Sequence, residues 1–161
     1  VNCCRAVLPL MKAAGGGTII NLVGAGVGWK VFQPGKTAYI TSKFAVYGFT
    51  EALAREVEDA NIRVNALSPG SVDTCLRDGL VDDAQRRRVR ENAEDLSPDA
   101  AARMVSFLVS EKCGPLTGKI ISARWDDPDI LAAQSQQLNN RCLMTLRKID
   151  GRNYLESPAD L

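Results

Sequence analysis

The sequence predicts an α/β fold: part of a doubly wound parallel sheet, with about three strands and flanking helices. Thr18–Val23 is a nearly continuous apolar run rich in β-branched residues, which is typical of a strand buried on both faces of a parallel sheet, and Ile62–Leu67, closed by Ser68-Pro69-Gly70, is a second expected buried strand. Helical segments separate these runs, and this alternation favours a parallel sheet with right-handed crossovers. Because three strands make a thin open sheet, we expect the N-terminal half of the domain to precede Val1.

Two helices are expected before the second strand. Cys3–Ala14 has apolar side chains at helical spacing and ends at consecutive glycines, while Pro9 within it predicts a kink or a later start. Ala38–Glu58 is the longest predicted helix and has two apolar stripes. One stripe consists of Ile40, Phe44 and Tyr47, and the other of Val46, Phe49, Leu53 and Val57. A surface helix needs only one, so the second stripe predicts a further packing partner, with a second subunit as one candidate.

More helices are expected after the second strand. Residues 82–96 form a charged segment with helical spacing of opposite charges. Ser97 as N-cap and Pro98 in the first turn then predict a helix that runs to about Ser110.

The C-terminal part adds a strand and a helix. Lys119–Trp125 is the third expected strand. Asp127 and Pro128 open a last helix that reaches about Leu138. We therefore expect residues 1–125 to belong to the sheet domain and residues 126–161 to form a C-terminal helix and polar tail.

The composition argues against several kinds of partner and site. A net charge of +1 gives no reason to expect nucleic acid, and no apolar run approaches the ~18 residues of a membrane span. Five cysteines without a Cys-x-x-Cys pair argue against disulfides or a metal site and, with no visible leader, favour the cytoplasm. The chain has no histidine, so acid/base chemistry would fall to Tyr, Lys, Asp, Glu or Cys.

Tyr39 and Lys43 are the candidate chemical pair. They lie four residues apart on the longest predicted helix, so they project from one face of it. An ammonium close to a phenol stabilises the phenolate and lowers the tyrosine pKa, which suits general acid/base work. The spacing alone is common in helices, but strand-like runs before and after it favour a site at the carboxyl ends of those strands.

Other motifs have plainer interpretations. Gly24, Gly26 and Gly28 follow a strand but lack the full Gly-x-Gly-x-x-Gly spacing, so a phosphate loop is the weaker interpretation. The basic run Arg86–Arg90 lies among acidic residues at helical spacing, which favours a salt-bridged surface helix over a nucleic-acid site. The loop Ser68–Thr74 follows a strand, where ligands bind in open α/β sheets, but a plain strand-to-helix turn fits it equally.

Five motifs occur in an order that resembles one family. They are Leu8-Pro9-x-Met11, Gly17-Thr-Ile-Ile-Asn21, Tyr39-x-x-Ser42-Lys43, Arg63-Val-Asn65-Ala-x-Ser68-Pro69-Gly70 with Thr74, and Leu116-Thr-Gly118. Over residues 1–125 the chain resembles the C-terminal half of a short-chain dehydrogenase/reductase. The resemblance implies a partial Rossmann-like sheet and an NAD(P)-dependent oxidoreductase that interconverts an alcohol and a carbonyl.

The resemblance also implies roles for matching positions. Tyr39 would exchange a proton with the substrate oxygen, and Lys43 would hold the nicotinamide ribose and lower the Tyr39 pKa. The residues implied in binding NAD or NADP are Tyr39, Lys43, Pro69, Gly70, Val72 and Thr74. Asn65 is expected to be structural. The first helix and the helix that carries Tyr39 are expected to form a dimer interface, so we expect a homo-oligomer.

The chain departs from the family at the active-site serine, which should follow Asn21 closely. Residues Val23–Gly26 stand there instead. The glycine-rich cofactor loop and the residue that selects NAD or NADP would lie before Val1. Two hypotheses stay open: an oxidoreductase with Tyr39 as acid/base, or a non-catalytic nucleotide-binding or dimerisation module. Glycine backbone amides could replace the serine's hydrogen bond to a developing oxyanion.

Overall fold

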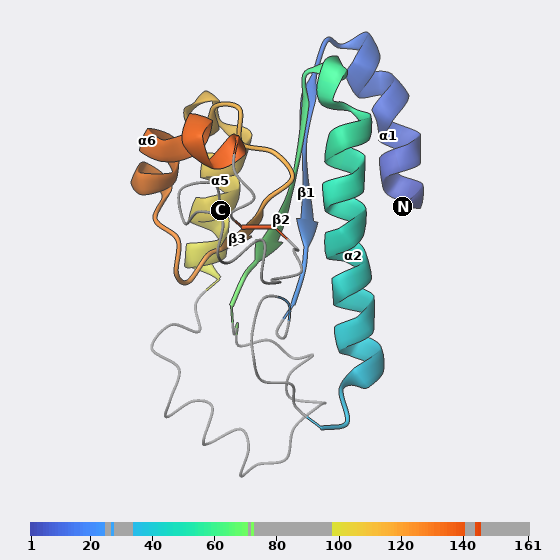
Figure 1. The fold of residues 1–161 in the computed structure, drawn as a ribbon, viewed down its shortest axis with the longest axis vertical. Coiled ribbons are helices and arrows are strands. Elements are labelled where there is room, and N and C mark those ends of the chain that lie inside the picture. The colour runs from blue at the N-terminus through green and yellow to red at the C-terminus, as the bar shows by residue number, and fades with distance from the viewer. Residues whose placement is uncertain (25–26, 28–33, 71, 73–97, 141–143, 146–161) are drawn as a thin grey trace, which may run out of the picture.

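The computed structural model describes residues 1–24, 27, 34–70, 72, 98–140 and 144–145. Its parallel sheet has the strand order β1 (Gly17–Leu22), β2 (Ile62–Ser68) and β3 (Ile120–Ser122) (Figure 1). The register places Leu22 beside Leu67 and Ser68 beside Ser122. The predicted α/β fold with a parallel sheet is confirmed.

Helices cover both faces of the sheet. On one face lie α1 (Asn2–Ala13) and α2 (Thr37–Glu56), side by side, and on the other lie α5 (Asp99–Val109) and α6 (Pro128–Asn139) (Figure 1). The short 3-10 helices η1 (Glu58–Ala60) and η2 (Glu111–Cys113) follow α2 and α5. The central strand is therefore buried on both sides: its Val64 packs in the core on the α1 and α2 side, and its Leu67 in the core on the α5 and α6 side.

Much of each apolar stripe of α2 packs against other parts of the described chain. Phe44 and Tyr47 pack with Ala66 of the sheet, while Phe49, Leu53 and Val57 pack against the sheet together with residues of α1. Those α1 residues are Cys4, Leu8 and Met11. The further partner that the second stripe predicted is therefore α1 of the same chain, so the stripe alone does not require a second subunit.

Some predicted boundaries were wrong. The third strand ends at Ser122 rather than Trp125, because the Ser122 Oγ accepts hydrogen bonds from the Arg124 and Trp125 amides and closes a turn there. Helix α5 begins at Asp99 with Pro98 at its N-cap position, and Ser97 lies outside the described residues.

The predictions for the other helices had mixed outcomes. Helix α1 starts at Asn2 and includes Pro9, so the later start is wrong. Helix α6 has the expected cap, because the Asp127 carboxylate accepts hydrogen bonds from the Asp129 and Ile130 amides. The charged helix predicted over 82–96 lies outside the described residues.

Two polar contacts hold the approach to β3 against the rest of the domain. The fully buried Asn65 donates from Nδ2 to the Leu116 carbonyl and accepts from the Lys119 amide through Oδ1. The Met144 carbonyl accepts two hydrogen bonds, from the Ile120 amide at 2.8 Å and from the Tyr47 hydroxyl at 2.9 Å. The geometry of Asn65 agrees with the structural role expected for it, since both of its partners are backbone groups.

Candidate active site

The three strands end at one edge of the sheet. Beyond the ladder, the Val23 amide donates to the Leu67 carbonyl at 3.0 Å, and the Ala123 amide donates to the Ser68 carbonyl at 2.9 Å. Helix α2 begins near this edge, beside the carboxyl end of β1 (Figure 1). Residues early in α2 and residues just after each strand are thus brought together, which is where open α/β sheets bind ligands.

Tyr39 and Lys43 lie at this edge. The Lys43 Nζ is 5.7 Å from the centroid of the Tyr39 ring and donates a hydrogen bond of 3.2 Å to the carbonyl of Leu22, the last residue of β1. The side chain of Tyr39 is 44% exposed, so its ring is open to solvent on one side. The pair therefore shares one face of α2 at the carboxyl end of β1, as the four-residue spacing predicts.

Gly24 is the residue that faces the Tyr39 hydroxyl. Gly24 is buried, and a Cβ added to it would collide with the Tyr39 hydroxyl and come within 3.3 Å of the Lys43 Cγ. Val23 instead packs in the core with Tyr47 and Ala66. Of the positions left open for the missing serine, Ala25 and Gly26 lie outside the described residues, and Gly24 is the one whose missing side chain would point at the phenol.

The loop after β2 contributes a backbone turn beside the same edge. Gly70 has φ of +82°, a left-handed conformation that favours glycine, and a Cβ there would lie 3.7 Å from the Cβ of Arg124. Pro69 and Val72 are half-buried in this loop. Thr74 lies outside the described residues, as do Gly26 and Gly28 of the glycine run and the basic run Arg86–Arg90.

Comparisons with known proteins decide the family. Residues 1–123 match a family model described as Enoyl-(Acyl carrier protein) reductase. The 3-oxoacyl-[acyl-carrier-protein] reductase FabG of Chlamydia muridarum is 34% identical over 123 residues, which cover 75% of this chain and 49% of that protein. The chain belongs to the short-chain dehydrogenase/reductase family.

Solved structures of short-chain dehydrogenases/reductases share the fold. A 3-oxoacyl-[acyl-carrier protein] reductase from Brucella melitensis is 31% identical with a TM-score of 0.63, and the likeness covers 75% of this chain and 46% of that one. A 7α-hydroxysteroid dehydrogenase complexed with NADH, 24% identical, has a TM-score of 0.65 and is matched over 74% of this chain and 47% of its own. The chain spans about half the length of the curated relatives it matches.

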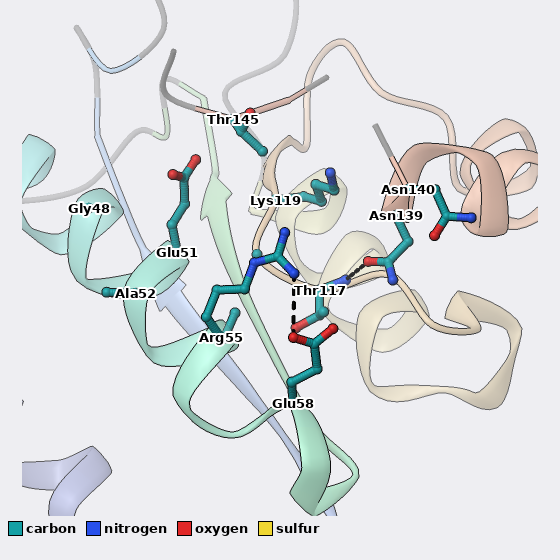
Figure 2. A pocket seen from close by; sticks show the side chains of 12 residues that line it. Gly48, Glu51, Ala52, Arg55, Glu58, Thr117, Lys119, Asn139, Asn140 and Thr145 are labelled. Carbon is teal, nitrogen blue, oxygen red and sulfur yellow. Dashed lines mark hydrogen bonds and ion pairs between the residues drawn. The ribbon is translucent and has the colours of Figure 1, made fainter. Parts of the chain in front are cut away.

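A cavity of about 600 Å³, with several polar side chains in its lining, lies beside the C-terminal half of α2 (Figure 2). Glu51 and Arg55 of α2 form one wall, and Thr117 and Lys119, just before β3, line it from the other side. None of the predicted catalytic or cofactor-binding residues lines the cavity. Its position before β3 puts it toward the amino ends of the strands, opposite to the edge that carries the candidate pair.

Burial raises the pKa of two side chains in the described part of the chain. Burial raises the pKa of the Cys113 thiol, against the nearby Arg63 guanidinium, which lowers it. Burial also raises the pKa of the Asp126 carboxyl, against a hydrogen bond from the Ser122 amide. Within the described ranges, no cluster of three or more metal-ligating side chains occurs, and no helix is long and apolar enough to cross a membrane.

Two features of the carboxyl edge of the sheet were not predicted from the sequence. Gly24 was not separated from its neighbours, because a glycine gives no side-chain signal. Arg124 and Trp125, which follow β3 and are both exposed, were also passed over. The available signal was a large aromatic residue, Trp125, directly after a strand. It was overlooked because the predicted third strand included Trp125.

Proposed function

We propose that the whole protein is an NAD(P)-dependent oxidoreductase that interconverts an alcohol and a carbonyl, with Tyr39 as acid/base. The observation that carries the proposal is the joint position of the Tyr39 ring and the Lys43 ammonium at the carboxyl end of β1, with Tyr39 open to solvent. Membership of the short-chain dehydrogenase/reductase family supports the same reaction class. In the whole protein, residues of this chain would form one border of the cofactor site.

The residues present fit a nicotinamide cofactor. A lysine ammonium has three N–H donors, and the Leu22 carbonyl takes one, so two can serve the hydroxyls of a ribose. Gly70 in its left-handed turn keeps the loop free of a side chain where a flat ring would approach, and Pro69 and Val72 lie in the same loop. Thr74 is proposed as a further contact on the family resemblance alone. When bound, the cofactor would exchange a hydride with the substrate carbon.

Tyr39 and Lys43 divide the remaining work. In the reductive direction the Tyr39 hydroxyl donates its proton to the substrate oxygen as the carbonyl becomes an alcohol, and the proton returns to Tyr39 in the oxidative direction. The Lys43 ammonium stabilises the phenolate that is left and orients the cofactor ribose. The proton and the hydride together account for the two hydrogens gained or lost by the substrate.

A non-catalytic nucleotide-binding or dimerisation module is the second candidate. Gly24 favours it, because this chain has no hydroxyl where a side chain would face Tyr39. An oxyanion donor of that kind contributes about 3 kcal/mol to catalysis, so its loss would slow an enzyme without ending the reaction. A backbone amide beside Gly24 could supply the donor instead, since glycine allows close approach.

The direct test follows nicotinamide absorbance when the whole protein is mixed with NADH or NADPH and a panel of ketones and aldehydes. Oxidation of the cofactor that depends on both protein and carbonyl supports the oxidoreductase. Saturable cofactor binding without turnover of any carbonyl, or of any alcohol with NAD or NADP, would favour the non-catalytic module.

Gly24→Ala is expected to lower turnover by roughly 10²-fold, because a Cβ at this position forces the Tyr39 hydroxyl away and small displacements of a reacting group are costly. Gly24→Ser should recover part of this loss, since its hydroxyl adds a donor for the substrate oxygen. Steady-state kinetics of both variants measure the effect. Gly48→Ala is the matched control, because nothing lies within 4 Å of a Cβ added there. Equal turnover in the Ala and Ser variants would contradict a missing donor at position 24.

We also propose that the protein is a homo-oligomer in the cytoplasm. Leu10 on α1 is 71% exposed and Val7 lies partly open on the same helix, which leaves apolar surface beside α2 for a second copy. Cys3, Cys4 and Cys113 are free thiols in the described part of the chain, which suits a reducing compartment.

A further inference from the structure

Arg124 and Trp125 form an exposed stack at the carboxyl end of β3. The guanidinium carbon of Arg124 lies 4.5 Å from the centroid of the Trp125 ring, and Trp125 is 60% exposed. An arginine that stacks on an aromatic ring keeps its N–H donors around the edge of the guanidinium plane, where they can bind an anion. The stack therefore has the form of a binding surface for a planar anion.

The turn that carries the stack is held by its own side chains. The Ser122 Oγ accepts hydrogen bonds of 3.3 Å from the amides of Arg124 and Trp125. The Asp126 carboxylate accepts from the Ser122 amide at 2.7 Å, and the Asp126 amide donates to the Ser122 carbonyl at 3.1 Å. The next residue, Asp127, caps α6. The backbone beneath Arg124 is thus fixed before any ligand arrives, which lowers the entropy lost on binding.

Arg124 lies at the same carboxyl edge of the sheet as the candidate pair. Gly70 is its neighbour, since a Cβ on Gly70 would lie 3.7 Å from the Cβ of Arg124. Two residues before each of these stand Ser68 and Ser122, which are partners in the ladder, and Ile120 of the same strand packs with Tyr47 of α2. Neighbouring strands are about 4.8 Å apart, so the ends of β1 and β3 are separated by roughly 10 Å.

We propose that Arg124, stacked on Trp125, binds an anionic group of the substrate, most simply a carboxylate, while Tyr39 faces the reacting oxygen. The inference rests on the proposed function and names the substrate class: a carbonyl or alcohol that carries a carboxylate a few bonds from the reacting carbon. Among the described residues Arg124 forms no ion pair with a carboxylate; the ion pair Arg55–Glu58 lies elsewhere, on α2 and η1. A guanidinium binds a carboxylate through two parallel N–H donors, which fixes the substrate's direction as well as its affinity.

A binding experiment tests the site without relying on turnover. Trp125 reports on its own neighbourhood in a background of the whole protein in which Trp29, the other tryptophan of this sequence, and any tryptophan outside this sequence are replaced by phenylalanine. Titration with levulinate, a keto acid, is expected to change the fluorescence saturably, and its neutral methyl ester is expected not to. Arg124→Met should shift the levulinate titration to roughly tenfold higher concentration, and Arg124→Lys should shift it less. No response to levulinate, or an unchanged response in Arg124→Met, overturns the proposal.

Kinetics then assign the anion to the substrate. Arg124→Met should raise the KM for levulinate roughly tenfold, the loss expected for one charge-assisted hydrogen bond, and leave the constants for methyl levulinate unchanged. Arg103→Met, at an exposed arginine on α5, is the matched control and should change neither. Weaker cofactor binding in Arg124→Met would assign the guanidinium to a cofactor phosphate instead, and equal losses for acid and ester would assign it to the fold; both overturn the proposal. A fluorescence response in a protein without turnover would leave the anion site standing and remove the proposed function.

Discussion

Tyr39→Phe is expected to lower turnover by about 10² to 10⁴-fold and to leave cofactor affinity nearly unchanged. The substitution removes only the hydroxyl that faces Gly24, and the ring can keep its place near the Lys43 ammonium. Hydride transfer would then proceed without a proton donor for the substrate oxygen. Steady-state kinetics give the turnover, and a fluorescence titration with NADH or NADPH gives the cofactor affinity.

Tyr47→Phe is the matched control for this variant. Tyr47 lies on the same helix, but its hydroxyl is buried and donates to the Met144 carbonyl, so its loss should cost about 1 kcal/mol of stability and leave the kinetics intact. Undiminished turnover in Tyr39→Phe would remove Tyr39 from the chemistry and favour the non-catalytic module.

Lys43→Met is expected to damage both chemistry and cofactor binding. Turnover should fall because the phenolate of Tyr39 loses its nearby positive charge, and cofactor affinity should fall roughly tenfold because the ribose loses a charged donor. Methionine keeps much of the length of the side chain without the ammonium. The contrast with Tyr39→Phe is the informative part, since only the lysine variant should weaken the cofactor.

Stability measurements separate this effect from simple unfolding. The hydrogen bond from Lys43 to the Leu22 carbonyl is exposed, so water can replace the ammonium there and the thermal midpoint should change little. Lys12→Met on α1 removes an exposed lysine away from the carboxyl edge and serves as the control for charge. Cofactor affinity equal to that of the parent protein in Lys43→Met would contradict a role in holding the ribose.

The two longer strands could be predicted from the sequence because apolar, often β-branched residues dominate them. In β2 only Arg63 and Ser68 are less than buried, and its apolar Ile62, Val64, Ala66 and Leu67 can be recognised without any partner. The third strand is short and ends where the Ser122 hydroxyl turns the backbone. No period in the sequence marks that point, because the side chains of Ala123 and Trp125 are as apolar as those of a continuing strand.

The site was predicted in part for a similar reason. Tyr39 and Lys43 lie on one helix, so a fixed spacing places them together. The contact between Tyr39 and Gly24 joins a helix to a residue just after a strand, and only the packing of α2 on the sheet decides which residue of the run meets the phenol. The second stripe of α2 predicted a further packing partner without naming it, because α1, which packs with Phe49, Leu53 and Val57, precedes β1 in the sequence.

The carbonyl of Met144 occupies a backbone amide on the outer side of β3. A strand at the border of a sheet presents unpaired amides that can recruit a strand from another molecule. On β3 the amide of Ile120 is already bonded to Met144, and the Tyr47 hydroxyl holds the same carbonyl from across the domain. A single backbone oxygen, fixed by a side chain of α2 nearly a hundred residues earlier in the chain, thus stands where an incoming strand would begin to pair.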